Sequence, residues 1–231
     1  MNPFKRLSTQ LLCTLLLSSS AIAAPLNRAE FAEKFPQIEE GSSKPENKAI
    51  VCPFHRMLER AGLYDKEVGM GGRLLVSIAK ITTLAKQWGC AIKECGTVAT
   101  AVSAGQLTNL STKPGFANLG ALHRALGVSH ECGFTFAKGG SVVSDEQRAT
   151  SLSRLEALAD SNGRLTFDNL NTVKNQICEE QGEVNTFASQ VEVKLIYSFL
   201  GGKDRGFVDY DDVVRFFHAE LPKTISAPSG L

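Results

Sequence analysis

The sequence predicts an all-α protein with a single compact domain of about eight helices. Apolar residues recur at steps of three and four over long stretches, which is the period of a helix with one buried face. Sustained alternation of apolar and polar residues, the pattern typical of half-buried strands, is lacking. The chain of 231 residues is also long enough to bury one sizeable core.

Residues 1–24 have the pattern of a secretory signal peptide. Lys5 and Arg6 give the positive start, residues 11–17 form the apolar middle, and residues 21–23 fit the small-residue cleavage site. The apolar run is too short to span a bilayer, and no later segment reaches the length that a membrane helix needs. We therefore expect an exported protein, secreted or periplasmic, without a membrane anchor.

The remaining chain divides into an extension, a domain and a tail. Residues 25–48 are polar and contain several Pro and Gly residues, so we expect a short helix and a loop. The domain is expected over residues 49–222. Small residues dominate 223–231, which predicts a flexible tail.

The helices of the domain are predicted from apolar stripes and capping residues. One stripe runs through residues 74–88 in steps of three and four, and a shorter helix is expected over 119–126. Ser144 with Gln147 three residues later fits a capping box, which opens a helix through 144–158. Three further helices are expected, at about 167–180, 187–199 and 210–219.

Two short segments have some features of calcium-binding loops. Residues 160–165 and 203–208 each contain a Gly with an apolar residue two positions later. If the Gly of the first segment takes loop position six, positions one and twelve hold Leu158 and Asn169, where carboxylates should dominate. We interpret both segments as ordinary interhelical turns.

The overall charge points to a small, uncharged ligand. The chain has 25 Lys and Arg residues against 24 Asp and Glu residues. Proteins that bind nucleic acid or anionic membranes usually carry a marked basic excess, so neither is an expected partner. We expect a monomer that binds a small apolar organic compound.

The cysteines predict a disulfide-braced domain with one thiol left over. Cys13 lies in the signal peptide, and the cysteines that remain are odd in number: Cys52, Cys90, Cys95, Cys132 and Cys178. In an oxidising compartment thiols tend to pair, and pairs of Cys90 with Cys95 and of Cys132 with Cys178 would leave Cys52 alone. Either Cys52 is then a metal ligand, or it is a buried bystander, or the cysteines pair differently.

The Cys52-Pro53 pair suggests a thiol with a lowered pKa. Pro53 suits the first turn of a helix, which places Cys52 at the N-cap, where backbone N–H groups and the helix dipole face the sulfur. A thiolate is the form that binds iron. His55 offers an alternative, a Cys/His nucleophile pair of a thiol-dependent hydrolase, but no third orienting group is evident.

Several segments, in the same order, are similar to motifs of the heme-thiolate peroxidases, the family of fungal chloroperoxidase and unspecific peroxygenase. The first, Val51-Cys52-Pro53 with the residues up to Tyr64, resembles the family's Pro-Cys-Pro motif and the helix that follows it. Further similar segments are 101–108, 116–128, Ser-Leu-Ser-Arg at 151–154, 191–201 and 213–222. Together the segments span most of the chain after residue 24.

The resemblance implies an all-α domain around a heme pocket. Heme b (iron protoporphyrin IX) would be held by Cys52 next to Pro53, with hydrogen peroxide as the oxidant. The reaction would be halogenation, one-electron oxidation or oxygen transfer to a small apolar substrate. A Cys90–Cys95 bridge would fit the family's short-loop disulfide. Three aromatic residues are expected to line the pocket: Phe54, Phe134 and Phe136.

The chain departs from the family at the Glu-His-Asp motif, which should directly precede Ser-Leu-Ser-Arg. That position reads Gln147-Arg148-Ala149. Either His130 and Glu131 are the displaced equivalents, which makes them candidate catalytic residues, or Asp145-Glu146 takes their place. In the family this motif binds a cation beside a heme propionate, so a Mg or Mn ion at that position is in question.

Peroxide cleavage also needs a carboxylate that moves a proton between the two oxygens. The resemblance places it downstream of Ser-Leu-Ser-Arg, where Glu179, Glu180, Glu183 and Glu192 are candidates, and Glu180 is preferred. Because the Glu-His-Asp motif is missing, an alternative function is a disulfide-braced helical binding protein that kept the scaffold without the chemistry.

Overall fold

The computed structural model describes residues 28–64, 74–88, 92–127 and 132–224, and over these ranges the chain is mostly helical. The all-α expectation therefore holds in outline, with two small antiparallel sheets in addition. The helices are α1 Arg28–Lys34, η1 Pro36–Ile38, α2 Pro53–Arg60, α3 Ile78–Gln87, α4 Ile92–Leu107, η4 Leu119–Arg124, α5 Asp145–Leu158, α6 Phe167–Glu180, α7 Phe187–Phe199, α8 Gly202–Arg205 and α9 Tyr210–Phe217. The strands are β1 Leu75–Ser77, β2 Phe116–Asn118, β3 Arg164–Leu165 and β4 Val208–Asp209. The proposed signal peptide, 1–24, lies outside the described residues.

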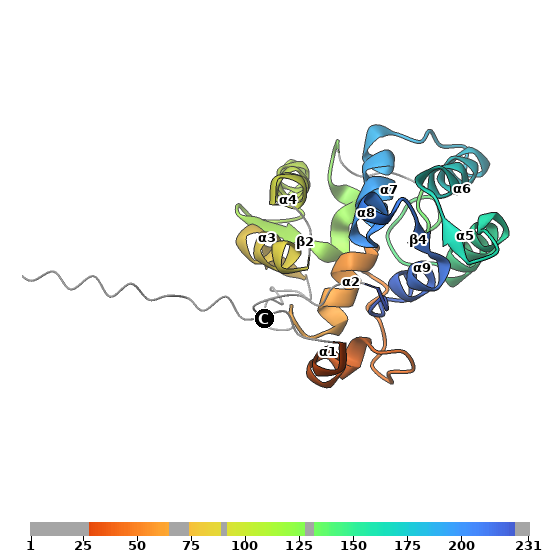
Figure 1. Cartoon of the computed structure of the whole chain (residues 1–231). Coiled ribbons are helices and arrows are strands. Elements are labelled where there is room, and N and C mark those ends of the chain that lie inside the picture. The colour runs from red at the N-terminus through yellow and green to blue at the C-terminus, as the bar shows by residue number, and fades with distance from the viewer. Residues whose placement is uncertain (1–27, 65–73, 89–91, 128–131, 225–231) are drawn as a thin grey trace, which may run out of the picture.

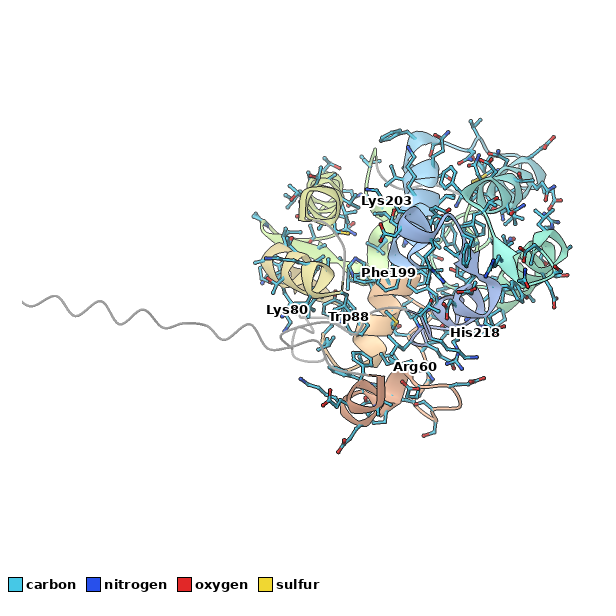
Figure 2. All side chains as sticks on the ribbon, in the orientation of Figure 1. Arg60, Lys80, Trp88, Phe199, Lys203 and His218 are labelled. Atoms are coloured by element: carbon cyan, nitrogen blue, oxygen red, sulfur yellow. A yellow bond between two sulfur atoms is a disulfide. The ribbon has the colours of Figure 1, made fainter. Side chains whose placement is uncertain are left out.

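Helix α2 lies in the middle of the molecule (Figure 1). The α3–α4 pair lies on one side of it, and α5, α6 and α9 pack against one another on the other side. One continuous cluster of buried apolar side chains runs from Phe31 in α1 to Leu221 after α9. Side chains fill the space between the helices, with Trp88 and Phe199 near the centre (Figure 2). Within the described ranges, no helix combines the length and the apolar character that crossing a bilayer requires.

The expected helix over 74–88 begins four residues later than its apolar stripe. Residues Leu75–Ser77 form strand β1, which pairs with β2 so that Leu75 faces Asn118. The Ser77 hydroxyl then accepts the Lys80 backbone N–H at 3.2 Å and caps α3. These residues therefore form a strand because they pair with β2, although their apolar period alone predicts a helix.

The expected helix over 119–126 is a kinked 3-10 helix. The Asn118 side chain caps it by accepting the Gly120 N–H, and Ala121 leaves helical geometry. The Gln106 amide of α4 donates to the carbonyls of Asn118 and Ala121, both at 2.8 Å. In a continuous α-helix these two carbonyls would instead accept backbone N–H groups of the same helix.

The later helices agree closely with their local sequence signals. Ser144 accepts the Gln147 N–H at the start of α5, and α6 and α7 have the expected bounds. Helix α9 ends at Phe217, two residues early, because Ala219 adopts the left-handed conformation with φ of 56°. Local sequence signals therefore predict the positions of these helices in the second half of the chain.

The two calcium-like turns lie side by side. Strands β3 and β4 pair inside them, with Leu165 opposite Val208. The Asp160 carboxylate accepts the backbone N–H groups of Asn162 and Arg164 at 2.8 and 2.9 Å, and these bonds hold its pKa below the usual range. The Asp160 carboxylate thus binds backbone N–H groups of its own turn, as is expected of an ordinary interhelical turn.

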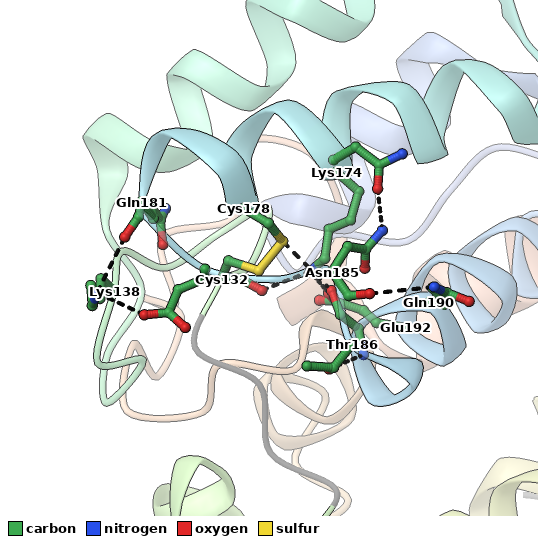
Figure 3. Close-up of a disulfide and its surroundings, with 12 residues drawn as sticks. Cys132, Lys138, Lys174, Cys178, Gln181, Asn185, Thr186, Gln190 and Glu192 are labelled. Atoms are coloured by element: carbon green, nitrogen blue, oxygen red, sulfur yellow. Dashed lines mark hydrogen bonds and ion pairs between the residues drawn. A yellow bond between two sulfur atoms is a disulfide. The ribbon is translucent and has the colours of Figure 1, made fainter.

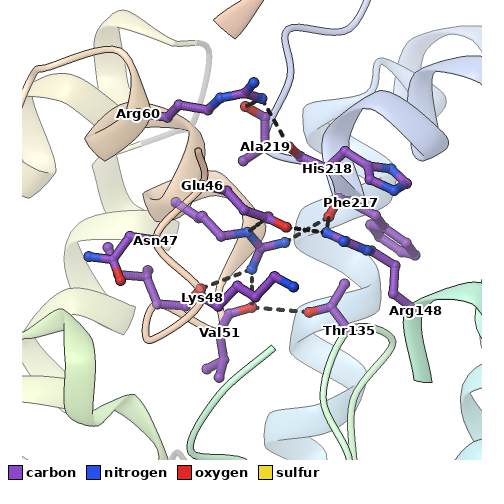
Figure 4. Close-up of polar contacts among 12 residues, drawn as sticks. Glu46, Asn47, Lys48, Val51, Arg60, Thr135, Arg148, Phe217, His218 and Ala219 are labelled. Atoms are coloured by element: carbon purple, nitrogen blue, oxygen red, sulfur yellow. Dashed lines mark hydrogen bonds and ion pairs between the residues drawn. The ribbon is translucent and has the colours of Figure 1, made fainter. Parts of the chain in front are cut away.

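A buried ionic cluster connects the extension to three parts of the domain (Figure 4). The fully buried Arg56 of α2 lies 2.7 Å from one Glu46 carboxylate oxygen, and Arg148 of α5 lies 2.6 Å from the other. Both guanidinium groups also donate to the carbonyl of Phe217 at the end of α9, at 2.8 and 3.1 Å. Glu46 therefore compensates two buried positive charges at the meeting point of α2, α5 and α9.

Replacing Glu46 by Ala should destabilise the protein strongly. Two guanidinium groups would stay buried without their shared carboxylate, which typically costs about 3–5 kcal/mol. The free energy of unfolding, measured in urea, checks this. The matched control is Asp145→Asn, because Asp145 pairs with the same Arg148 but its side chain is 61% exposed. A loss from Glu46→Ala no larger than that from the control would contradict the role of the cluster.

Candidate functional site

A cavity of about 360 Å³ opens between α2, α3, α4, η4 and α7. This volume lies in the range of small-molecule and cofactor pockets, roughly 300–1,000 Å³. Nearly half of the lining side chains are small or branched and apolar: Val51, Ile81, Ala85, Val98, Ala99, Val102, Ala117, Leu119, Leu122, Ala188, Val191, Leu195 and Ile196. Such a lining suits a flat or compact apolar ligand.

Cys52 borders this cavity from the N-terminus of α2. It occupies the N-cap position, as expected, with Pro53 in the first turn, and its thiol is unbridged. Burial raises the pKa of the thiol above its usual range, and the negative charge of Glu192 raises it further. The backbone N–H groups of His55 and Phe54, in the first turn of α2, act in the opposite direction and lower the pKa. The thiol is therefore neutral at pH 7 unless a cation binds in front of it.

The disulfide between Cys132 and Cys178 confirms one expected pair (Figure 3). Cys95 is disulfide-bonded as well, and its expected partner, Cys90, lies outside the described residues. Among the cysteines that the structure describes, Cys52 is the one with a free thiol. The odd thiol of the sequence is thus the one that faces the cavity.

Glu192 of α7 borders the same cavity as Cys52. Its side chain is 17% exposed and forms an ion pair with Lys174 of α6, which is fully buried. Lys174 also donates to the carbonyl of Cys132 at 2.8 Å (Figure 3). The other acidic side chain that lines the cavity, Asp204, belongs to the exposed helix α8. Glu192 is therefore the carboxylate held closest to the interior of the site.

Glu180, which the sequence favoured, lies on the surface away from the cavity. Its side chain is 59% exposed and accepts from Arg154 at 2.8 Å. Glu179 is exposed too, and Glu183 pairs with Lys138 at 2.7 Å. The inward face of α6 is taken by Val173, Ile177 and Cys178 together with Lys174, so the next two residues of the helix point outward.

The other expected site residues divide between the cavity, the core and undescribed segments. Phe54 and Phe136 line the cavity, whereas Phe134 packs against Phe217 in the core with ring centroids 5.3 Å apart. His130 and Glu131 lie outside the described residues. Their proposed catalytic role is neither supported nor opposed by the geometry.

Residues 145–154, which end with the segment Ser151-Leu152-Ser153-Arg154, do not border the cavity. Arg148 belongs to the Glu46 cluster, and the Ser151 hydroxyl donates to the carbonyl of Phe134 at 2.8 Å. Asp145 pairs with Lys48 and Arg148. Over the parts of the chain that the structure describes, no three His, Cys, Asp or Glu side chains gather to form a cation site.

His55 is placed differently from the base of a thiol-dependent hydrolase. Its Nδ1 lies 3.0 Å from the hydroxyl of Tyr64, and burial lowers its pKa to about 4. The group of His55 that lowers the pKa of the Cys52 thiol is its backbone N–H, not its imidazole. A nucleophilic cysteine needs its thiolate form, whereas burial keeps this thiol protonated.

The chain was compared with models of known protein families and with curated proteins, and neither comparison finds a match. The site itself combines a free thiol and a half-buried carboxylate that is paired with a buried lysine, and both the thiol and the carboxylate border one apolar cavity.

Without a bound ligand, Cys52 should react slowly with iodoacetamide at neutral pH. Because burial raises the thiol pKa, the thiolate appears only at a pH above that of an ordinary thiol, and the reaction rate should rise with pH through that raised midpoint. Mass spectrometry of labelled protein measures the rate, with the urea-unfolded chain as the reference. Glu192→Gln should lower the midpoint. A midpoint below that of the unfolded chain would show that the thiol is activated instead.

Proposed function

We propose that the protein is an exported heme-thiolate peroxidase, with Cys52 as the axial ligand of heme b iron and hydrogen peroxide as oxidant. The observation that carries the proposal is that the free thiol and the half-buried carboxylate of Glu192 border one apolar cavity. The Cys132–Cys178 disulfide agrees with an oxidising compartment, secreted or periplasmic.

The residues of the cavity fit a heme. Cys52 lies at the N-cap of α2, where the backbone N–H groups of Phe54 and His55 favour the thiolate, and a metal cation in front of the sulfur would favour it further. Apolar side chains form most of the walls and suit the porphyrin face. His123 and the exposed Lys203 (labelled in Figure 2) also line the cavity and could pair with propionate carboxylates.

The heme would supply the iron at which peroxide is cleaved and from which an oxidising equivalent passes to the substrate. Glu192 would take the proton of one peroxide oxygen on its carboxylate and deliver it to the other oxygen, which leaves as water. The ion pair with Lys174 would hold this carboxylate in place for the transfer.

The apolar walls would select the substrate. The small side chains of Ala85, Ala99, Ala117 and Ala188 leave space, and the aromatic rings of Phe54 and Phe199, which pack edge to face at 5.0 Å, also line the cavity. An uncharged, apolar compound loses little hydration on entering such a site, whereas a charged one would lose much. We therefore propose small apolar organic compounds as substrates.

Protein refolded with hemin should show a strongly red-shifted Soret band when reduced under carbon monoxide, because a thiolate donates electron density to the iron. Cys52→Ala should lose this shift while keeping a folded circular-dichroism spectrum. A protein that stays colourless would exclude the proposed function. A heme spectrum unchanged by Cys52→Ala would exclude Cys52 as the ligand.

Glu192→Gln should lower the rate of peroxide turnover by about 10²–10⁴-fold, the usual contribution of a general acid–base group. Glu180→Gln should leave the rate close to that of the wild type, because Glu180 is on the surface. Both variants should keep the thiolate spectrum. If Glu180→Gln proves the more damaging of the two, the proton-transfer role of Glu192 is wrong.

A binding protein without peroxidase chemistry is the second candidate function. It is favoured by the residues Gln147-Arg148-Ala149, where Arg148 takes part in the Glu46 cluster and no cation-binding carboxylate is present. Such a protein would bind an apolar ligand, or heme itself, in the same cavity. Peroxide turnover separates the two functions, because a heme-loaded carrier would show the spectrum and no turnover.

A further inference from the structure

Lys174 has an unusual position for a lysine. Its side chain has no exposed surface, and its ammonium group pairs with the Glu192 carboxylate and donates to the Cys132 carbonyl at 2.8 Å (Figure 3). The ammonium also lies 5.2 Å from the ring centroid of Phe134. These contacts belong to α7 and to the segment that contains Cys132 and Phe134, so Lys174 joins α6, α7 and the chain around the disulfide.

A buried ion pair such as that of Lys174 with Glu192 is in general a weak source of stability. Burying both charges carries a large desolvation cost, and apolar side chains of similar volume often serve a core equally well or better. The pair therefore suggests a role for the charge at the cavity. Its acidic partner is the carboxylate that borders the cavity beside Cys52.

The disulfide fixes the other contact of Lys174. Cys178 lies one helical turn after Lys174 on α6, so both side chains project from the same face of the helix. The bond from Cys178 to Cys132 therefore holds the Cys132 carbonyl at a set distance from the lysine. Because the disulfide ties Cys132 to α6, the Cys132 carbonyl stays close to the Lys174 ammonium. The ammonium therefore has little freedom to move away from Glu192.

We propose that Lys174 is a positioning residue, which the Cys132–Cys178 disulfide holds in place and which in turn holds the Glu192 carboxylate at the cavity. This inference rests on the proposed function, because it assigns Lys174 a role through the carboxylate that would move the peroxide proton. Lys174 itself does not line the cavity. It acts on the reaction only through the place and the charge of Glu192.

A double-mutant cycle on Lys174→Met and Glu192→Gln tests the proposal, first in the heme-free protein. Each single change should lower the melting temperature, Lys174→Met by about 6 °C or more, because it leaves a buried charge without its partner. The double variant should lose much less than the two single losses together. Lys194→Met is the matched control, since Lys194 lies on α7 two residues from Glu192 and is exposed. Additive losses would overturn the proposal.

The same cycle is then measured on the heme-loaded protein. Lys174→Met should lower peroxide turnover about tenfold to a hundredfold in the wild-type background, the cost of a misplaced catalytic group, and should cause no further loss in the Glu192→Gln background. A lysine with a merely structural role would lower the rate in both backgrounds, which would overturn the inference. So would wild-type turnover in Lys174→Met.

The spectrum of the wild-type protein separates this result from a failure of the proposed function. If the wild type shows the thiolate spectrum and the cycle is additive, the inference alone fails. If the wild type takes up no heme, the peroxidase proposal fails, and the positioning role fails with it, whatever coupling the heme-free cycle shows.

Discussion

The direction of the Cys52 thiol depends on one buried guanidinium group. Arg56 donates to the carbonyls of Ile50 and Val51 at 2.9 and 3.1 Å, directly before the cysteine, and its own charge is compensated by Glu46. The same group reaches the carbonyl of Phe217 at the end of α9. The backbone that enters α2 is therefore fixed to the end of the neighbouring helix α9, and this constraint holds Cys52 at the cavity.

Much of the fold was predictable because its signals are local. Ser144 and Thr166 accept backbone N–H groups within the first turn of the helices that follow them, and the apolar stripes of α6 and α7 gave their bounds. The prediction was wrong at Leu75–Ser77, where the residues pair with Phe116–Asn118. The apolar period of one segment does not show that it pairs with another strand about forty residues away. The residues of β1 were therefore predicted to belong to the first turn of α3.

The site was predictable in part, for the same reason. The position of Cys52 followed from Pro53 and from the odd number of cysteines, both visible in the sequence. To choose among the acidic residues, one must know which face of its helix points to the cavity, and the sequence alone does not give this. In α7 a signal was present, since Ala188, Val191, Leu195 and Phe199 form an apolar stripe beside Glu192 and all line the cavity. Lys174 gave no such signal, because only the packing of α6 on α7 shows that it is buried.

The backbone N–H groups that favour a thiolate at Cys52 belong to the main chain of α2. Main-chain groups at a helix N-terminus keep their positions when side chains are exchanged, because helix geometry sets them. In the proposed function they would lower the electron density on the sulfur and so raise the reduction potential of the iron that it would hold. Substitutions around the cavity would then alter the choice of substrate and leave that potential nearly the same.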